Sequence, residues 1–130
     1  GARAISSPAP LLPRACWGNA APPLLELLAL DEAAFERRFA HSPIRRIKRR
    51  GLVRNVCVAA GNWGNPAAIP ALIALLADPE PLVRGHAAWA LGRIGGEEAT
   101  AAITLTLASE TDEEARQEMV GGLSFYASTA

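Results

Sequence analysis

The chain has 130 residues with thirteen basic and thirteen acidic side chains, so its formal net charge at pH 7 is zero. Half of the residues are hydrophobic but only 5% are aromatic, a composition that favours closely packed helices over strands. A chain of this length can form one continuous core, but not a large enzyme with its own cofactor pocket. The longest apolar run, 67–77, contains a proline and is too short to span a bilayer, so we expect no membrane partner.

Proline and glycine divide the chain into segments. Residues 1–22 are rich in proline and have no helical period, which predicts an extended lead-in. Residues 23–52 are expected to form a helical linker segment, and residues 53–130 a domain of stacked helical repeats. The chain starts at Gly1 without a methionine, as a fragment of a longer protein would, and prolines interrupt any secretory leader. We therefore expect a cytoplasmic location.

Capping side chains and glycines set the expected helix boundaries. A capping side chain precedes a proline at Ser42–Pro43, Asn65–Pro66 and Asp78–Pro79. Thr111 and Glu114 have the spacing of a capping box, while Gly61, Gly64 and the pair 95–96 are expected at helix ends. These signals predict helices over 24–40, with Asp31 capping a second segment inside that range, and over 44–61, 66–77, 80–94, 97–108 and 112–125.

One helical sequence pattern occurs twice in the chain, about thirty-one positions apart. Placing Gly61 over Gly92 also aligns Ala59 with Ala90. A period of that length is typical of stacked helical repeats, in which no unit buries its apolar face alone. The sequence therefore predicts an all-α fold, a short right-handed α-solenoid of helical hairpins in two layers. The residues expected to face inward are Ile69, Leu72, Ile73, Leu76, Val83, Ala87, Ala90, Leu91 and Ile94.

Charge is distributed unevenly along this neutral chain. Eight of the thirteen bases fall between Arg37 and Arg54, a stretch without an acid, whereas acids dominate from Glu97 to Glu118. This asymmetry is typical of an element that binds a polyanion. On a helix beginning at Pro43, residues 46, 49 and 50 share one face and could follow a row of phosphates. The candidate nucleic-acid-binding residues are Arg45, Arg46, Lys48, Arg49, Arg50, Arg54, Arg84 and Arg93.

An alternative for the same bases is structural. They could form a solvated helix face, or pair with Glu26, Asp31, Glu32 and Glu36.

Other chemically active residues give weaker signals. His41 and His86 have no acid or nucleophile at catalytic spacing. Cys57 lies on an apolar helix face and is expected to be a small buried hydrophobe. Trp89 is expected in the core, while Trp63, at a helix end, could be a packed loop residue or could cover a cofactor or an adjacent domain. No catalytic residue and no metal site is predicted.

The run DPEPLVRGHAAWALGRIG, residues 78–95, resembles the HEAT-like repeats of the phycobilisome-lyase type. Two earlier segments, LLELLALDEAAFERRFAHSPIRR (24–46) and RGLVRNVCVAAGNWGNPAAIPAL (50–72), followed by PLVRGHAAWALGRIGG (81–96), resemble the C-terminal part of epoxyqueuosine reductases. The resemblance runs from about residue 11 to residue 96 and makes 53–130 a HEAT-like repeat domain.

The resemblance implies that this chain is part of a bacterial oxidoreductase, which converts epoxyqueuosine to queuosine at the tRNA wobble position. In that family cobalamin and two iron–sulfur clusters serve the reaction, and the cluster-binding cysteine motifs and the catalytic acid lie in an upstream domain. None of those motifs is present here, and Cys16, within RACWGN, is given no ligand role. The implied partners are tRNA and the missing N-terminal catalytic domain of the same chain.

Two hypotheses remain open from the sequence. The first is a tRNA-binding region that contributes affinity and orientation but no reacting group. The second is a stand-alone HEAT-repeat scaffold that binds an acidic protein.

Overall fold

The computed structural model describes residues 24–129, and the predicted lead-in lies outside that range. The described residues form seven α-helices and two short 3₁₀-helices and contain no strand. The elements are α1 (Leu24–Leu28), α2 (Glu32–Phe39), η2 (Pro43–Ile47), α3 (Lys48–Trp63), η3 (Pro66–Ala68), α4 (Ile69–Leu75), α5 (Pro81–Ile94), α6 (Glu97–Leu107) and α7 (Glu113–Thr129). The all-α prediction is confirmed.

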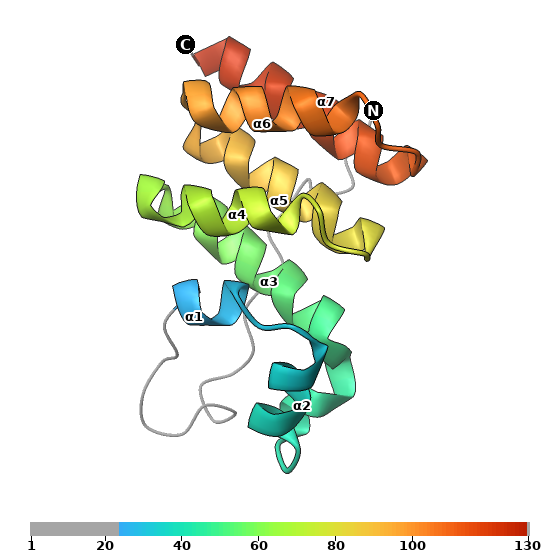
Figure 1. The fold of residues 1–130 in the computed structure, drawn as a ribbon. Coiled ribbons are helices and arrows are strands. Elements are labelled where there is room, and N and C mark those ends of the chain that lie inside the picture. Colours follow the sequence, from blue (N-terminus) through green and yellow to red (C-terminus); the bar gives the residue numbers. More distant parts are fainter. Residues whose placement is uncertain (1–23, 130) are drawn as a thin grey trace.

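The longer helices are arranged in two layers (Figure 1). Helices α3, α5 and α7 stack side by side and run in the same direction, so their N-terminal ends lie along one edge of the molecule. Helices α4 and α6 run the opposite way and cover them, and α1 packs against α3 and α4. This is a stack of helical hairpins, as the repeat predicts.

Local capping explains most helix boundaries. The Asp31 side chain accepts the amide of Ala34 at 2.7 Å and starts α2, so the predicted helix 24–40 is two helices. Ser42 and Asn65 cap η2 and η3 as expected, with a proline at the first helical position. The left-handed backbone of Gly64, with φ 73°, ends α3.

Two predicted caps are wrong. Asp112, and not the pair Thr111 and Glu114, accepts the amide of Ala115 at 3.0 Å and starts α7. Asp78 does not cap α5, which begins at Pro81 after Glu80. The carboxylate of Asp78 instead binds Arg49 and accepts the amide of Glu80 at 3.0 Å.

One glycine prediction is also wrong. Gly61 lies inside α3 and not at its end, and a Cβ placed there would lie 3.1 Å from Cα of Ala90 on α5. Gly92 occupies the matching place on α5, where a Cβ would lie 2.5 Å from Cα of Gly122 on α7. The repeated glycine is therefore needed for close approach between successive helices of one layer.

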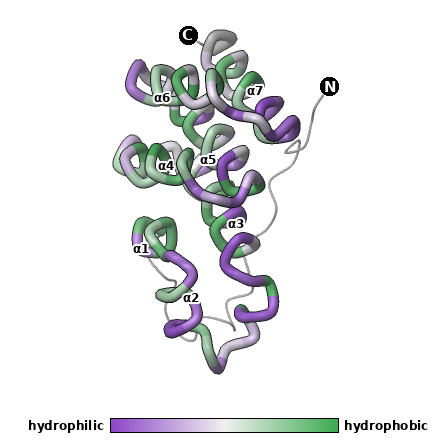
Figure 2. Tube along the Cα trace, turned by 45° about the vertical axis from the view of Figure 1, so that its right-hand side comes forward, coloured by the Kyte–Doolittle hydropathy of each residue, from purple (hydrophilic) through white to green (hydrophobic). Residues whose placement is uncertain are grey.

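A single hydrophobic core connects the two layers. The predicted inward residues belong to it, although Ile73 and Ile94 are only partly buried at its margin. Cys57 is fully buried, as predicted, and burial raises the pKa of its thiol. In Figure 2 hydrophilic stretches lie on α2, at the start of α3 and at the start of α7. Within the described residues, no helix has the length and apolarity needed to cross a bilayer.

Candidate nucleic-acid interface

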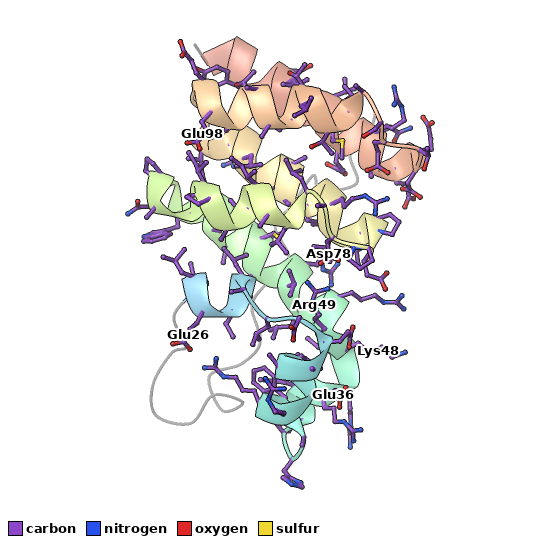
Figure 3. The ribbon with its side chains drawn as sticks, viewed as in Figure 1. Glu26, Glu36, Lys48, Arg49, Asp78 and Glu98 are labelled. Atoms are coloured by element: carbon purple, nitrogen blue, oxygen red, sulfur yellow. The ribbon has the colours of Figure 1, made fainter. Side chains whose placement is uncertain are left out.

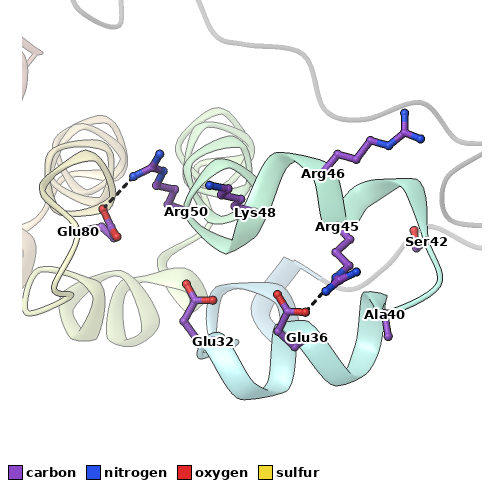
Figure 4. A pocket seen from close by; sticks show the side chains of 9 residues that line it. All are labelled: Glu32, Glu36, Ala40, Ser42, Arg45, Arg46, Lys48, Arg50 and Glu80. Carbon is purple, nitrogen blue, oxygen red and sulfur yellow. Dashed lines mark hydrogen bonds and ion pairs between the residues drawn. The ribbon is translucent and has the colours of Figure 1, made fainter.

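Four of the predicted basic residues surround one open hollow of about 630 Å³, which we call the basic hollow (Figure 4). Its cations come from η2 and from the first turn of α3, at the edge where the N-terminal ends of the stacked helices lie. Carboxylates from α2 and from the residue before α5 complete its wall. The lining residues are Glu32, Glu36, Ala40, Ser42, Arg45, Arg46, Lys48, Arg50 and Glu80.

The backbone at Lys48 explains why these cations surround a hollow. The sequence predicts one helix over 44–61, but the chain forms the 3₁₀-helix η2 first and enters α3 through Lys48, with φ 66° and ψ 165°. Residues other than glycine rarely adopt that backbone conformation. The prediction of a single continuous helix face is therefore wrong, because the helix axis changes between Arg46 and Arg50.

Arg49 does not belong to the basic hollow. Its residue exposure is only 6%, and its guanidinium donates to both carboxylate oxygens of Asp78, at 3.2 Å for Oδ2, and to the carbonyl of Leu30 at 2.7 Å (Figure 3). Hydrogen bonding to Asp78 raises the pKa of Arg49, against the opposing effect of burial. Arg49 on α3 thus joins the α1–α2 connection, through the hydrogen bond to Leu30, to the α4–α5 connection, through the ion pair with Asp78. The prediction that Arg49 faces a ligand is wrong, because Leu30 and Asp78 already accept the hydrogen bonds of its guanidinium inside the protein.

Arg84 is also engaged inside the protein. Its Nε and Nη2 atoms donate to the carboxylate of Glu110 at 2.7 and 2.8 Å, and its Nη1 donates to the carbonyl of Asp78 at 2.8 Å. Hydrogen bonding to Arg84 lowers the pKa of Glu110. Arg84 therefore stabilises the loops that precede α5 and α7 and does not extend the basic hollow.

Arg93 is exposed but lies at the other end of α5. Its guanidinium stacks over the rings of Trp89 and Phe125, with distances of 5.2 and 5.0 Å to the ring centroids. Trp89, predicted in the core, is only partly buried and packs against the core next to Gly61. Because α3 and α5 run in parallel, Arg93 lies away from the N-terminal edge that carries the basic hollow.

Arg54 borders a second hollow of about 490 Å³, between the N-terminal parts of α5 and α7. It shares this hollow with Arg50, and its Nε atom is buried without a hydrogen-bond partner. The opposite wall carries Asp112, Glu114 and Glu118. The surface therefore changes from basic at α3 to acidic at α7.

Some bases pair with acids, as the structural alternative predicts. Arg38 pairs with Glu26 at 2.9 Å and Arg45 with Glu36 at 3.1 Å. Asp31 instead caps α2. Sequence reasoning missed Glu80, whose Oε1 lies 3.7 Å from Arg50 Nη1, because it is thirty positions from that arginine. The sequence signal that could have placed Glu80 near the basic hollow is its position directly before Pro81, which starts α5.

The remaining candidate residues show no catalytic arrangement. Burial lowers the pKa of His86, whose Nδ1 lies 2.9 Å from the carbonyl of Leu82. His41 is exposed on the loop before η2, and Trp63 is 49% exposed at the end of α3.

A resident metal or cluster does not fit the described part of the chain. Within residues 24–129, no group of three or more His, Cys, Asp or Glu side chains could hold a metal ion. Cys57 is enclosed in the core, and Cys16 lies outside the described residues.

Comparison with protein families gives a match to HEAT repeats over residues 50–124. The chain belongs to the HEAT-repeat family. The matched range begins in the first turn of α3 and ends within α7, so it contains the stacked layers of Figure 1.

This HEAT-repeat chain is homologous to the C-terminal part of epoxyqueuosine reductases. It is 36% identical over 107 residues to the epoxyqueuosine reductase of Bacillus cereus, which covers 82% of this chain and 28% of the reductase. An uncharacterized protein in the gldA 3′ region of Geobacillus stearothermophilus is 34% identical over 105 residues, which covers 80% of this chain and 49% of that protein. The chain therefore spans under a third of the Bacillus cereus reductase and about half of the Geobacillus stearothermophilus protein.

Solved structures give the same relationship. A crystal structure of an epoxyqueuosine reductase with a tRNA-Tyr epoxyqueuosine-modified tRNA stem loop matches with a TM-score of 0.77 and 33% identity. The match covers 82% of this chain and 28% of that one. The relative was thus solved with RNA.

Proposed function

We propose that this chain is the tRNA-holding region of an epoxyqueuosine reductase and that its basic hollow binds phosphate groups of the RNA. The observation that carries the proposal is the gathering of Arg45, Arg46, Lys48 and Arg50 around one open hollow. Homology to a reductase solved with a tRNA stem loop supports the choice of RNA over another polyanion.

The chemistry of the hollow suits a phosphate backbone better than a small substrate. Folded RNA presents phosphates and 2′-hydroxyls on its surface, while the base edges of its helices are hard to reach. Cations at an open rim can follow such a surface without enclosing it. Arg46 and Lys48 supply the cations that carry no acid partner among the described residues, so they are the expected first contacts.

The proposal extends to the whole protein. In it, epoxyqueuosine in tRNA would be reduced to queuosine by groups outside this chain, in a cytoplasmic enzyme whose upstream domain carries cobalamin and iron–sulfur clusters. This chain would supply affinity and orientation. The low share of the reductase that it covers, 28%, supports this division of roles.

The test is the affinity of the purified chain for an unmodified tRNA with a GUN anticodon, measured between low and high salt. Engagement of about four phosphates predicts that log K falls with log salt concentration with a slope of about −3 to −4. Arg46→Glu should weaken binding and reduce the slope by about one or more. Arg46→Glu/Lys48→Glu should abolish binding at physiological salt.

Arg93→Glu is the matched control, because it reverses one exposed arginine at the other end of α5. It should leave the tRNA affinity within about twofold, since long-range effects are screened at physiological salt. Equal losses of tRNA affinity in Arg46→Glu and Arg93→Glu would show that the affinity depends only on the net charge of the chain. Absence of tRNA binding, with a stable complex to an acidic protein, would favour the scaffold hypothesis.

A further inference from the structure

We propose, on the basis of the proposed function, that Glu36 and Glu80 set the affinity threshold of the basic hollow by competing for Arg45 and Arg50 with phosphate groups, which in the proposed function are those of RNA. Each carboxylate holds one arginine while the site is empty and is displaced by a phosphate group. A polyanion must then replace two ion pairs before it engages all four cations.

The cations of the hollow fall into two classes. Arg45 Nε lies 3.1 Å from Glu36 Oε1, and Arg50 Nη1 lies 3.7 Å from Glu80 Oε1. Arg46 and Lys48 form no ion pair with any described residue, and in Figure 4 the Arg46 side chain points away from both pairs. The hollow therefore has two available cations and two that are occupied.

The occupied cations are held loosely enough to be displaced. The side-chain exposures are 59% and 51% for Arg45 and Glu36, and 52% and 37% for Arg50 and Glu80. Ion pairs this exposed contribute little free energy, because water competes with both partners. A phosphate group can therefore replace either carboxylate.

The structural ion pairs of the same protein differ sharply from these. The side chains of Arg49 and Asp78 are only 7% and 6% exposed, and those of Arg84 and Glu110 only 18% and 3%. Those pairs are enclosed and hydrogen-bonded on both sides, so a ligand cannot reach them. The displaceable pairs, in contrast, both lie on the wall of the basic hollow.

The wall also repels an anion that does not displace the carboxylates. Glu32 and Glu36 on α2 and Glu80 in the connection before α5 face the hollow together with four cations (Figure 4). A weak polyanion meets these negative charges and gains only two free cations. RNA that makes further contacts elsewhere can still bind, so the carboxylates raise the threshold for every ligand and exclude the weakest ones.

The experiment measures the affinities of an RNA hairpin and of inorganic polyphosphate for the full chain and for Glu36→Gln/Glu80→Gln. Removing an exposed pair should free its arginine and raise the affinity roughly two- to fivefold for each carboxylate. The control Glu97→Gln/Glu98→Gln removes the same charge from two exposed acids at the start of α6. It should change either affinity by less than about twofold.

A double-mutant cycle separates pairing from net charge. Glu36→Gln should raise the affinity of the wild-type chain but not of Arg45→Gln, because the carboxylate acts through that arginine. Glu80→Gln and Arg50→Gln should behave in the same way.

The results distinguish this inference from the proposed function. A gain confined to the hollow variants and lost in the arginine backgrounds supports the inference. Equal gains in both charge-matched variants, or no gain, overturn it, while loss of RNA binding in Arg46→Glu still supports the proposed function. If the wild-type chain binds no RNA, the proposed function fails, and the polyphosphate gain alone decides the inference. Absence of binding by every variant to either ligand overturns both.

Discussion

Gly92 of α5 and Gly122 of α7 meet backbone to backbone. A Cβ added to Gly92 would lie 2.5, 2.6 and 2.8 Å from the Cα, O and C atoms of Gly122. Backbone atoms on a packed helix cannot rotate away as a side chain can, so the two helices approach this closely only without a Cβ.

Gly92→Ala should therefore destabilise the protein. Relief of the clash requires α7 to move away from α5, and overpacking of this kind costs about 1–3 kcal/mol of the free energy of unfolding. Urea denaturation followed by circular dichroism measures the change. Gly121→Ala is the matched control, because its Cβ would have nothing within 4 Å. That variant should be more stable by about 0.5–1 kcal/mol, since alanine is the better residue inside a helix. Equal destabilisation of both variants would contradict the close-approach explanation.

Loss of Arg49 should be among the most damaging single changes. Arg49→Met leaves the buried carboxylate of Asp78 without its cation, and an uncompensated buried charge costs about 3–5 kcal/mol. Arg50→Ala removes an exposed partner of Glu80 and should cost less than about 1 kcal/mol. Denaturant midpoints of the two variants check the difference.

The same measurement on Arg49→Met/Asp78→Asn tests the cause. Removing the negative charge as well should recover part of the stability lost in Arg49→Met, because no buried charge then stays unpaired. Additive losses in the double variant would instead assign the cost to lost packing around the arginine stem.

The predictable parts of this fold are those that depend on nearby residues. Asn65 with Pro66 starts η3, and Gly64 ends α3, because capping and backbone conformation need only local atoms. The thirty-one-residue period placed Gly61 and Gly92 in equivalent positions, although their role is helix contact at both places. The two-layer architecture follows from that period.

The site was predicted less completely, because distant contacts decide it. Arg49 belongs by composition to a basic surface, but Asp78, twenty-nine positions away, draws it into the interior. That contact also removes Asp78 from the capping role that its place before Pro79 predicts. The local sequence around Asp78 cannot show that Arg49 will bind it in place of a helix cap, because the Arg49–Asp78 contact exists only after α3 and α5 have packed.

Lys48→Gly should stabilise the protein. Lys48 has φ 66° and ψ 165°, a region open mainly to glycine, and a side chain held there costs about 1–3 kcal/mol. We expect a gain of about 1 kcal/mol, measured by thermal and urea unfolding. Lys48→Ala should bring no such gain, because it removes the ammonium group but keeps the Cβ. Arg50→Gly, inside the first turn of α3, should instead lose about 1 kcal/mol. A loss in Lys48→Gly equal to that of Arg50→Gly would show that the strain is absent.

Acid should remove the stabilisation that Glu110 provides. Hydrogen bonding to Arg84 lowers the pKa of this carboxyl in the folded state. The unfolded chain therefore takes up the proton first as the pH falls, so the stabilisation is complete above the ordinary glutamate pKa of about 4.3 and is lost through the lower folded pKa. Glu110→Gln should cost about 2–3 kcal/mol at pH 7, since it weakens two charge-assisted hydrogen bonds. The difference in unfolding free energy between wild type and variant should shrink steadily below pH 4.

Glu97→Gln, at an exposed acid on α6, is the control and should differ from wild type by only a few tenths of a kcal/mol in unfolding free energy at any pH. A wild-type-to-Glu110→Gln difference that stays constant from pH 7 to pH 3 would mean that the carboxylate charge does not stabilise the contact between α5 and the α6–α7 connection.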